Sequence, residues 1–146
     1  CVLLGAEIRG IRSYKPELAD GKWTVSELWF QEELALDMST GVINGDSLYG
    51  FSHYKKGKLF CLDTKTGEIQ WVGPPRTGRN VAFISMPGYV AALMDNGELR
   101  ILKATSEEYK PVASYKTAEV QSWAAPVFLK DGVLVKGKDK LTYWSF

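Results

Sequence analysis

The chain has 146 residues, the length of one domain and enough to enclose a hydrophobic core. Its 18 Lys and Arg nearly balance its 17 Asp and Glu, which argues against a nucleic-acid partner, because nucleic-acid binders carry a clustered basic excess. No apolar run approaches the roughly 20 residues of a membrane span. Aromatic residues at 12%, together with 14 glycines, favour β-structure with many turns.

Two cysteines, Cys1 and Cys61, cannot form a disulfide-rich scaffold, and with the one histidine, His53, a zinc site would also need carboxylates. The chain opens on Cys1 and runs directly into the apolar segment Val2-Leu3-Leu4. We therefore expect the chain to be a piece of a longer protein. A lipid-modified terminus at Cys1 is the alternative interpretation of this start.

Short runs rich in Val, Ile, Leu, Tyr and Phe recur along the chain, as in strands separated by tight turns. Asn-Gly and Asp-Gly pairs adopt positive φ at low cost and close hairpins. The segment from Val25 to Met38 is the best candidate for a helix, but it contains strand formers and has no cap at either end. We predict a meander of antiparallel strands. The turn signals are Asp20-Gly21, Asn44-Gly45-Asp46, Lys56-Gly57, Thr66-Gly67, Pro87-Gly88, Asn96-Gly97 and Asp131-Gly132.

The runs repeat with a fixed period. Strands that follow a turn begin at Leu48, Val90 and Val133, which are 42 and 43 residues apart. Aromatic residues that close each unit, at Trp29, Trp71 and Tyr115, are 42 and 44 residues apart, and we expect all three to be buried. Four short strands per roughly 40–45 residues are the signature of a β-propeller blade.

These observations predict an all-β fold, a β-propeller of four-stranded antiparallel blades that is present as an open arc of about three blades. The blade equivalents fall at roughly 1–30, 38–72, 80–116 and 123–146. The first lacks its first strand and the last lacks its outer strand. We expect residues upstream of Cys1 to pair with Leu141–Phe146, and the 146-residue chain alone to self-associate through its open edges.

The segment Cys61-Leu-Asp-Thr-Lys-Thr-Gly-Glu-Ile-Gln-Trp71 resembles the repeat of pyrroloquinoline-quinone-type (PQQ-like) β-propellers. In that repeat a strand ends in Asp, a Thr-Gly turn follows and a Trp closes the blade. Asp63 can accept backbone N–H bonds across the turn that contains Thr66, Gly67 can take the left-handed conformation, and Trp71 offers a flat surface to the next blade. Lys103 and Ser145 replace Asp63 in the later units. The segments 41–53 and 141–146 are similar to the C-terminal half of bacterial proteins of this superfamily.

The resemblance raises the possibility of a quinoprotein oxidoreductase, whose enzymes use calcium, a catalytic Asp and often adjacent cysteines. The two cysteines here are far apart, and no acidic cluster has a ligand spacing. His53 has no second histidine or nearby carboxylate to orient it, which favours a structural role. We expect no catalytic residue, metal or cofactor in this chain. The alternative is that cofactor residues lie in blades outside it.

A recognition role fits the sequence better, because loops on a rigid scaffold are where propellers bind their partners. In an up-and-down blade, the loops between second and third strands share a face with the connections between blades. We expect a protein partner or a small ligand to bind on that face, with Trp123 as an aromatic anchor. The alternative for Trp123 is that it packs between two blades. We predict a non-enzymatic binding or scaffold module, periplasmic or secreted, similar in repeat type to the lipoprotein scaffolds of outer-membrane protein assembly. The predicted interaction residues are His53, Lys55, Lys56, Arg76, Arg79 and Trp123.

Overall fold

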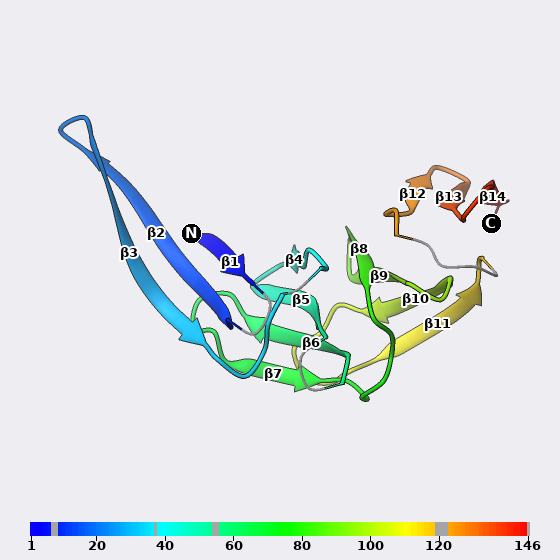
Figure 1. Cartoon of the computed structure of the whole chain (residues 1–146), viewed down its shortest axis with the longest axis horizontal. Coiled ribbons are helices and arrows are strands. Elements are labelled where there is room, and N and C mark those ends of the chain that lie inside the picture. Colours follow the sequence, from blue (N-terminus) through cyan, green and yellow to red (C-terminus); the bar gives the residue numbers. More distant parts are fainter. Residues whose placement is uncertain (7–8, 37, 54–55, 119–122, 146) are drawn as a thin grey trace.

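The computed structural model describes residues 1–6, 9–36, 38–53, 56–118 and 123–145. The regular elements of this part of the chain are all β-strands, and they form four antiparallel sheets in chain order. Figure 1 shows these sheets following one another along an open arc. The prediction of an all-β fold made of antiparallel blades in a partial, open arrangement is confirmed.

Each sheet is a meander in which every strand pairs with the next one along the chain. Sheet 1 contains β1 (Val2–Gly5), β2 (Ile11–Ala19) and β3 (Lys22–Gln31). Sheet 2 contains β4 (Val42–Asn44), β5 (Ser47–Ser52), β6 (Lys58–Asp63) and β7 (Ile69–Val72). Sheet 3 contains β8 (Val81–Met86), β9 (Tyr89–Met94), β10 (Glu98–Lys103) and β11 (Pro111–Lys116). Sheet 4 contains β12 (Val127–Leu129), β13 (Gly132–Lys136) and β14 (Leu141–Ser145).

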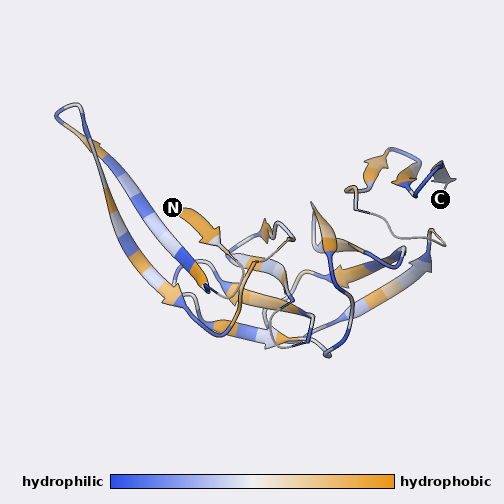
Figure 2. Ribbon diagram, viewed as in Figure 1, coloured by the Kyte–Doolittle hydropathy of each residue, from blue (hydrophilic) through white to orange (hydrophobic). Residues whose placement is uncertain are grey.

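The core lies between the sheets, because successive residues of a strand point to opposite faces. On β5 and β6, Leu48, Phe60 and Leu62 pack toward sheet 1, where they form a cluster with Ile11. The intervening residues of the same strands pack with Val90 and other residues of sheet 3. A third cluster joins sheets 3 and 4. The central strands are therefore buried on both faces. Figure 2 shows hydrophobic colouring along the middle of β6.

Trp71 closes sheet 2 as predicted, with only 7% of its surface exposed. Its indole lies against the rings of Tyr49 and Tyr109, at centroid distances of 5.9 and 5.5 Å. Trp29, the corresponding residue of sheet 1, is half-buried. Its ring lies against Gly67, where an added Cβ would be 2.5 Å from the indole and where φ is +75°. Gly67 thus provides both the turn and the room for Trp29.

The prediction that Tyr115 is buried is wrong, because 57% of its surface is exposed. Trp71 pairs with Cys61 on the neighbouring strand, and the residue in the matching register of sheet 3 is Ala113, opposite Ile101. Tyr115 lies two residues further along β11, opposite Leu99, on the face turned to sheet 4. Sheet 4 has no fourth strand in the described part of the chain, so a cavity of about 730 Å³ borders Tyr115 there.

Replacing Trp71 with Ala should lower the free energy of unfolding by about 3–5 kcal/mol, the cost of deleting a large buried aromatic side chain. Urea unfolding followed by circular dichroism measures this change. Trp23, which is 68% exposed, provides the matched control, and Trp23→Ala should change stability by about 0.5 kcal/mol or less. Equal effects of the two substitutions would contradict the packing described for Trp71.

Candidate recognition face

The loops that were predicted to share a face are joined by backbone hydrogen bonds. The β5–β6 loop meets the β7–β8 connection where Arg76 N donates to Lys56 O at 2.6 Å and Thr77 N donates to Gly57 O at 3.2 Å. The β7–β8 connection meets the β9–β10 turn where Asp95 N donates to Asn80 O at 2.9 Å. We call the surface formed by residues 53, 56–57, 73–80, 95–97, 116–118 and 137–140 the loop face.

Two cations of the loop face have an unusual backbone conformation. Lys56 has φ of +83° and Arg76 has φ of +62°, in the left-handed region that non-glycine residues rarely occupy. The hydrogen bond between Arg76 N and Lys56 O holds the two residues against each other, and both are exposed. The absence of a side chain at Gly57 lets the β5–β6 loop lie this close to the β7–β8 connection, because a Cβ at residue 57 would be 2.4 Å from Gly78 O. The loops therefore fix the positions from which two positive side chains extend.

Arg79 is anchored to the same face by Asp95. One carboxylate oxygen of Asp95 accepts from Arg79 N at 3.0 Å, and the other accepts from Arg79 Nε at 3.2 Å. The Asp95 side chain is 6% exposed, whereas 62% of the Arg79 side chain is exposed. A nearly buried carboxylate thus holds a guanidinium at the surface, which is an arrangement suited to binding a second carboxylate.

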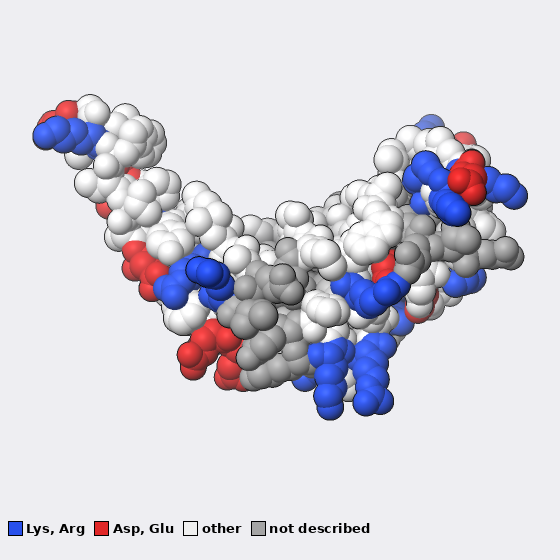
Figure 3. All heavy atoms as spheres, in the orientation of Figure 1, with Lys and Arg blue, Asp and Glu red and all other residues white. Residues whose placement is uncertain are grey.

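The other predicted residues are placed as follows. His53 is exposed and accepts a backbone hydrogen bond from Gly57 N at 3.2 Å, which closes the β5–β6 loop. Trp123 is 56% exposed in the connection between β11 and β12. Lys55 lies outside the described residues. Figure 3 shows Lys and Arg side chains standing out from the lower edge of the molecule near the middle of the arc, with acidic side chains further toward sheet 1.

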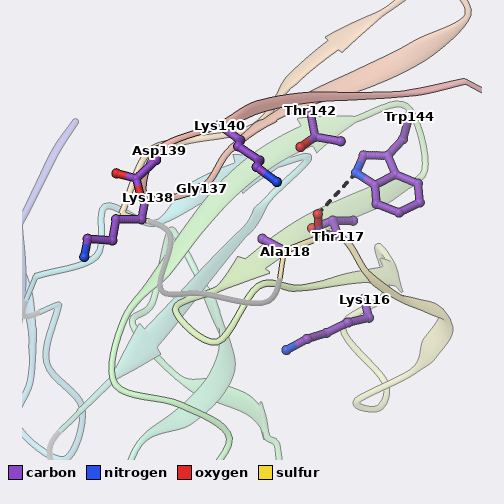
Figure 4. Close-up of a pocket in the computed structure, with 9 residues that line it drawn as sticks. All are labelled: Lys116, Thr117, Ala118, Gly137, Lys138, Asp139, Lys140, Thr142 and Trp144. Atoms are coloured by element: carbon purple, nitrogen blue, oxygen red, sulfur yellow. Dashed lines mark hydrogen bonds between the residues drawn. The ribbon is translucent and has the colours of Figure 1, made fainter.

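A hollow of about 460 Å³ adds basic residues that the sequence reasoning missed. It lies between the end of β11 and the β13–β14 turn, and its wall includes Lys116, Lys138 and Lys140 (Figure 4). The Trp144 indole closes one side and donates from Nε1 to Thr117 O at 3.2 Å. The run Lys136-Gly-Lys-Asp-Lys140 was the available sequence signal, but its proximity to Lys116 of sheet 3 depends on how sheet 4 packs against sheet 3.

The repeat motif lies at the opposite ends of the strands. Asp63 Oδ1 accepts from Lys65 N at 2.7 Å and from Thr66 N at 2.9 Å, and these two backbone bonds lower the pKa of the Asp63 carboxyl. Thr64 N in turn donates to Asp46 O of the β4–β5 turn at 2.9 Å. The bonding of Asp63 is that of a turn-forming residue.

Asp63→Asn should cost stability near neutral pH, with the difference from the wild type disappearing in acid. Because the pKa of Asp63 is lower in the folded chain than its ordinary value of 3.8, its stabilising effect is fully present above 3.8 and is lost as pH falls from there through the lower folded-state pKa. Urea unfolding of both proteins between about pH 6 and about pH 2.5 measures the gap. A gap that stays constant with pH would contradict the role of the carboxylate charge.

Cys61 has the surroundings of a packed core thiol. Burial raises the pKa of Cys61 to about 11, and burial likewise raises the pKa of its neighbour Tyr49 to about 12. The Cys61 thiol donates to Gln70 Oε1 at 2.9 Å. Nucleophilic cysteines need a depressed pKa and access, so Cys61 is unsuited to catalysis near neutral pH.

The native protein should therefore react with one equivalent of Ellman's reagent near pH 8, at exposed Cys1, and with two equivalents after unfolding in guanidinium chloride. The absorbance of the released thiolate gives the count. Cys61→Ser should leave the native count unchanged, and rapid labelling of two thiols in the native protein would contradict the burial of Cys61.

Among the described residues, no three His, Cys, Asp or Glu side chains are grouped so that they could hold a metal ion. In the same part of the chain, no helix is long and apolar enough to cross a membrane.

No protein-family model matches the chain, and no curated protein matches it. The crystal structure of BamB from Moraxella catarrhalis is similar, with a TM-score of 0.60 and 21% identity over 98% of this chain and 44% of that chain. The chain thus spans less than half the length of BamB. The computationally designed protein Ika8 gives a TM-score of 0.44 and 10% identity over 99% of this chain and 67% of its own. The likeness to BamB shows that the four sheets have a β-propeller fold.

Proposed function

We propose that the loop face is the recognition surface of a non-enzymatic propeller module, and that it binds an acidic protein partner. The observation that carries this proposal is the pair Lys56 and Arg76, held against each other in left-handed backbone conformations. Strained non-glycine backbone persists only where its surroundings impose it, and it clusters at ligand clamps and other functional positions. The strain here fixes two cations on one surface.

The chemistry of the face favours carboxylates. Arg76 and Arg79 offer planar guanidinium groups that pair with carboxylates through two parallel hydrogen bonds, and Lys56 adds a third positive charge. Trp123, exposed in the connection that follows residues 116–118 of the loop face, is an aromatic side chain of the kind found at binding hot spots. Loops on a rigid β-scaffold present these groups without a large ordering cost.

The setting of the module follows from its resemblances. The PQQ-like repeat at Cys61–Trp71 and the similarity in repeat type to the lipoprotein scaffolds of outer-membrane protein assembly support a bacterial protein that works outside the cytoplasm, in the periplasm or secreted. The fold likeness to BamB supports the same assignment. In this interpretation the protein binds a partner and holds it in place, and catalyses no reaction.

Poly-L-glutamate is the probe for this proposal, with binding followed by isothermal titration calorimetry at low and at near-physiological salt. Arg76→Glu should weaken binding by about tenfold or more, because it removes a charge-assisted contact and adds repulsion. Lys103→Glu is the matched control, since it makes the same charge change at the exposed end of β10 away from the loop face and should change affinity by about twofold at most. Equal losses in both variants would mean that only net charge matters, and would contradict the proposal.

A further inference from the structure

The hollow of about 460 Å³ on the loop face lies where sheet 4 packs against sheet 3. One of its walls is the end of β11 with the first residues after it, 116–118, and the other is the β13–β14 turn, 137–140. Thr142 and Trp144 of β14 complete the wall. Its three lysines outnumber its one carboxylate, Asp139, so the hollow is positively charged.

The junction between sheets 2 and 3 shows how the chain fills the corresponding place. Asp95 is the first residue after β9, the second strand of sheet 3. Its carboxylate accepts hydrogen bonds from Arg79 N and Arg79 Nε, and its side chain is 6% exposed. Asp95 therefore ties the turn of sheet 3 to the connection that leaves sheet 2. At this junction a nearly buried carboxylate lies between the two loops.

The turn of sheet 4 provides no carboxylate at that position. Gly137 is the first residue after β13, the strand that corresponds to β9, and it has no side chain. Lys136 Nζ donates to the carbonyl oxygens of Gly137 and Lys138, so the backbone of the turn has its own cation. Lys138 and Lys140 take part in no ion pair between described residues. The place of the acidic side chain is thus surrounded by ammonium groups that have no counter-charge.

Two lysines are placed on opposite walls of the hollow. Figure 4 shows the Lys140 side chain extending toward Thr117 on the opposite wall, whereas Asp139 extends the other way. Lys116 Nζ donates to Asn96 O at 2.7 Å, which holds the second ammonium group at the end of β11. The carboxylate of the turn therefore points away from the hollow, and a cation of the turn points across it.

We propose that the hollow binds a carboxylate side chain of the acidic partner, in the place that Asp95 fills at the preceding junction. Lys140 and Lys116 supply positive charge, and the Thr142 hydroxyl can donate a hydrogen bond. The Trp144 indole offers a flat apolar surface to the methylene groups of the inserted side chain. The volume of the hollow lies within the roughly 300–1,000 Å³ of ligand pockets. The inference rests on the proposed recognition role of the loop face and names the anchor of that contact, an Asp or Glu residue of the partner.

Nuclear magnetic resonance of the isotope-labelled chain, titrated with poly-L-glutamate, tests this proposal. The indole Nε1–H resonance of Trp144, assigned by its loss in Trp144→Phe, should shift and saturate at the affinity that calorimetry gives. Lys140→Gln should remove most of this shift and weaken binding by about fivefold, because it removes a partly enclosed contact between opposite charges. Lys130→Gln is the matched control, since it makes the same charge change in the β12–β13 turn at the other end of sheet 4, and it should change the affinity by less than about twofold.

Two small anions determine which chemistry the hollow prefers. Glutarate should move the Trp144 resonance at a lower concentration than inorganic phosphate does. A preference for phosphate would overturn the assignment of a carboxylate site. A Trp144 resonance that polyglutamate leaves in place, or equal losses of affinity in Lys140→Gln and Lys130→Gln, would overturn it as well. Circular dichroism verifies that the variants are folded.

Failure of this inference is separable from failure of the recognition proposal. If Arg76→Glu weakens polyglutamate binding and Lys140→Gln does not, the loop face is a recognition surface and the hollow is not its anchor. If Lys140→Gln abolishes the glutarate shift and Arg76→Glu leaves polyglutamate binding unchanged, the hollow binds carboxylates and the recognition proposal fails.

Discussion

The arrangement of the sheets depends on an indole hydrogen bond that crosses from one sheet to the next. Trp29 Nε1 donates to Thr64 O at 3.0 Å, and Trp71 Nε1 donates to Thr105 O at 2.8 Å. In both cases a rigid ring on an outer strand meets a backbone carbonyl in the turn of the following sheet. Such a bond satisfies the polar atom of a ring that is otherwise packed against apolar groups, and it fixes the position of one sheet along the next. The repeat in the sequence is therefore a repeat of junctions.

The acceptor side of this junction explains why the sequence motif is strong in one unit and weak in another. Asp63 shapes the turn that presents Thr64 O, through its bonds to Lys65 N and Thr66 N. The turn of sheet 3 has Lys103 in place of Asp63, yet its Thr105 O still accepts from Trp71. The junction requires a backbone carbonyl that can accept the indole N–H. Turns with different side chains can place such a carbonyl there. The Asp63-Thr-Lys-Thr-Gly67 motif is thus one way to build such a turn and is not necessary for it.

The same junction shows what the sequence could and could not predict. Turn glycines and Trp71 act locally, so the strands, the period and the loops sharing a face could be predicted from residue type and spacing. Tyr115 could not, because the 44-residue spacing displaces it by two positions from the register that Ala113 occupies. The basic hollow could not either, because Lys116 and Lys140 line it together only through the packing of sheet 4 against sheet 3. Contacts that depend on register or on a distant strand leave no local signal.

The junction between sheets 3 and 4 lacks the outer-strand indole bond of the other two junctions. With Ala113 at the position of Trp71, sheet 3 has no outer indole to donate to sheet 4. The bond runs in reverse, from Trp144 Nε1 of sheet 4 to Thr117 O at the end of sheet 3, and cavities of about 730 and 460 Å³ border the same two residues. The indole junctions of sheets 1 to 3 use the turns at one end of the strands, whereas the loop face uses the other end. Cations such as Arg76 therefore lie away from the indole bonds that join sheets 1 to 3.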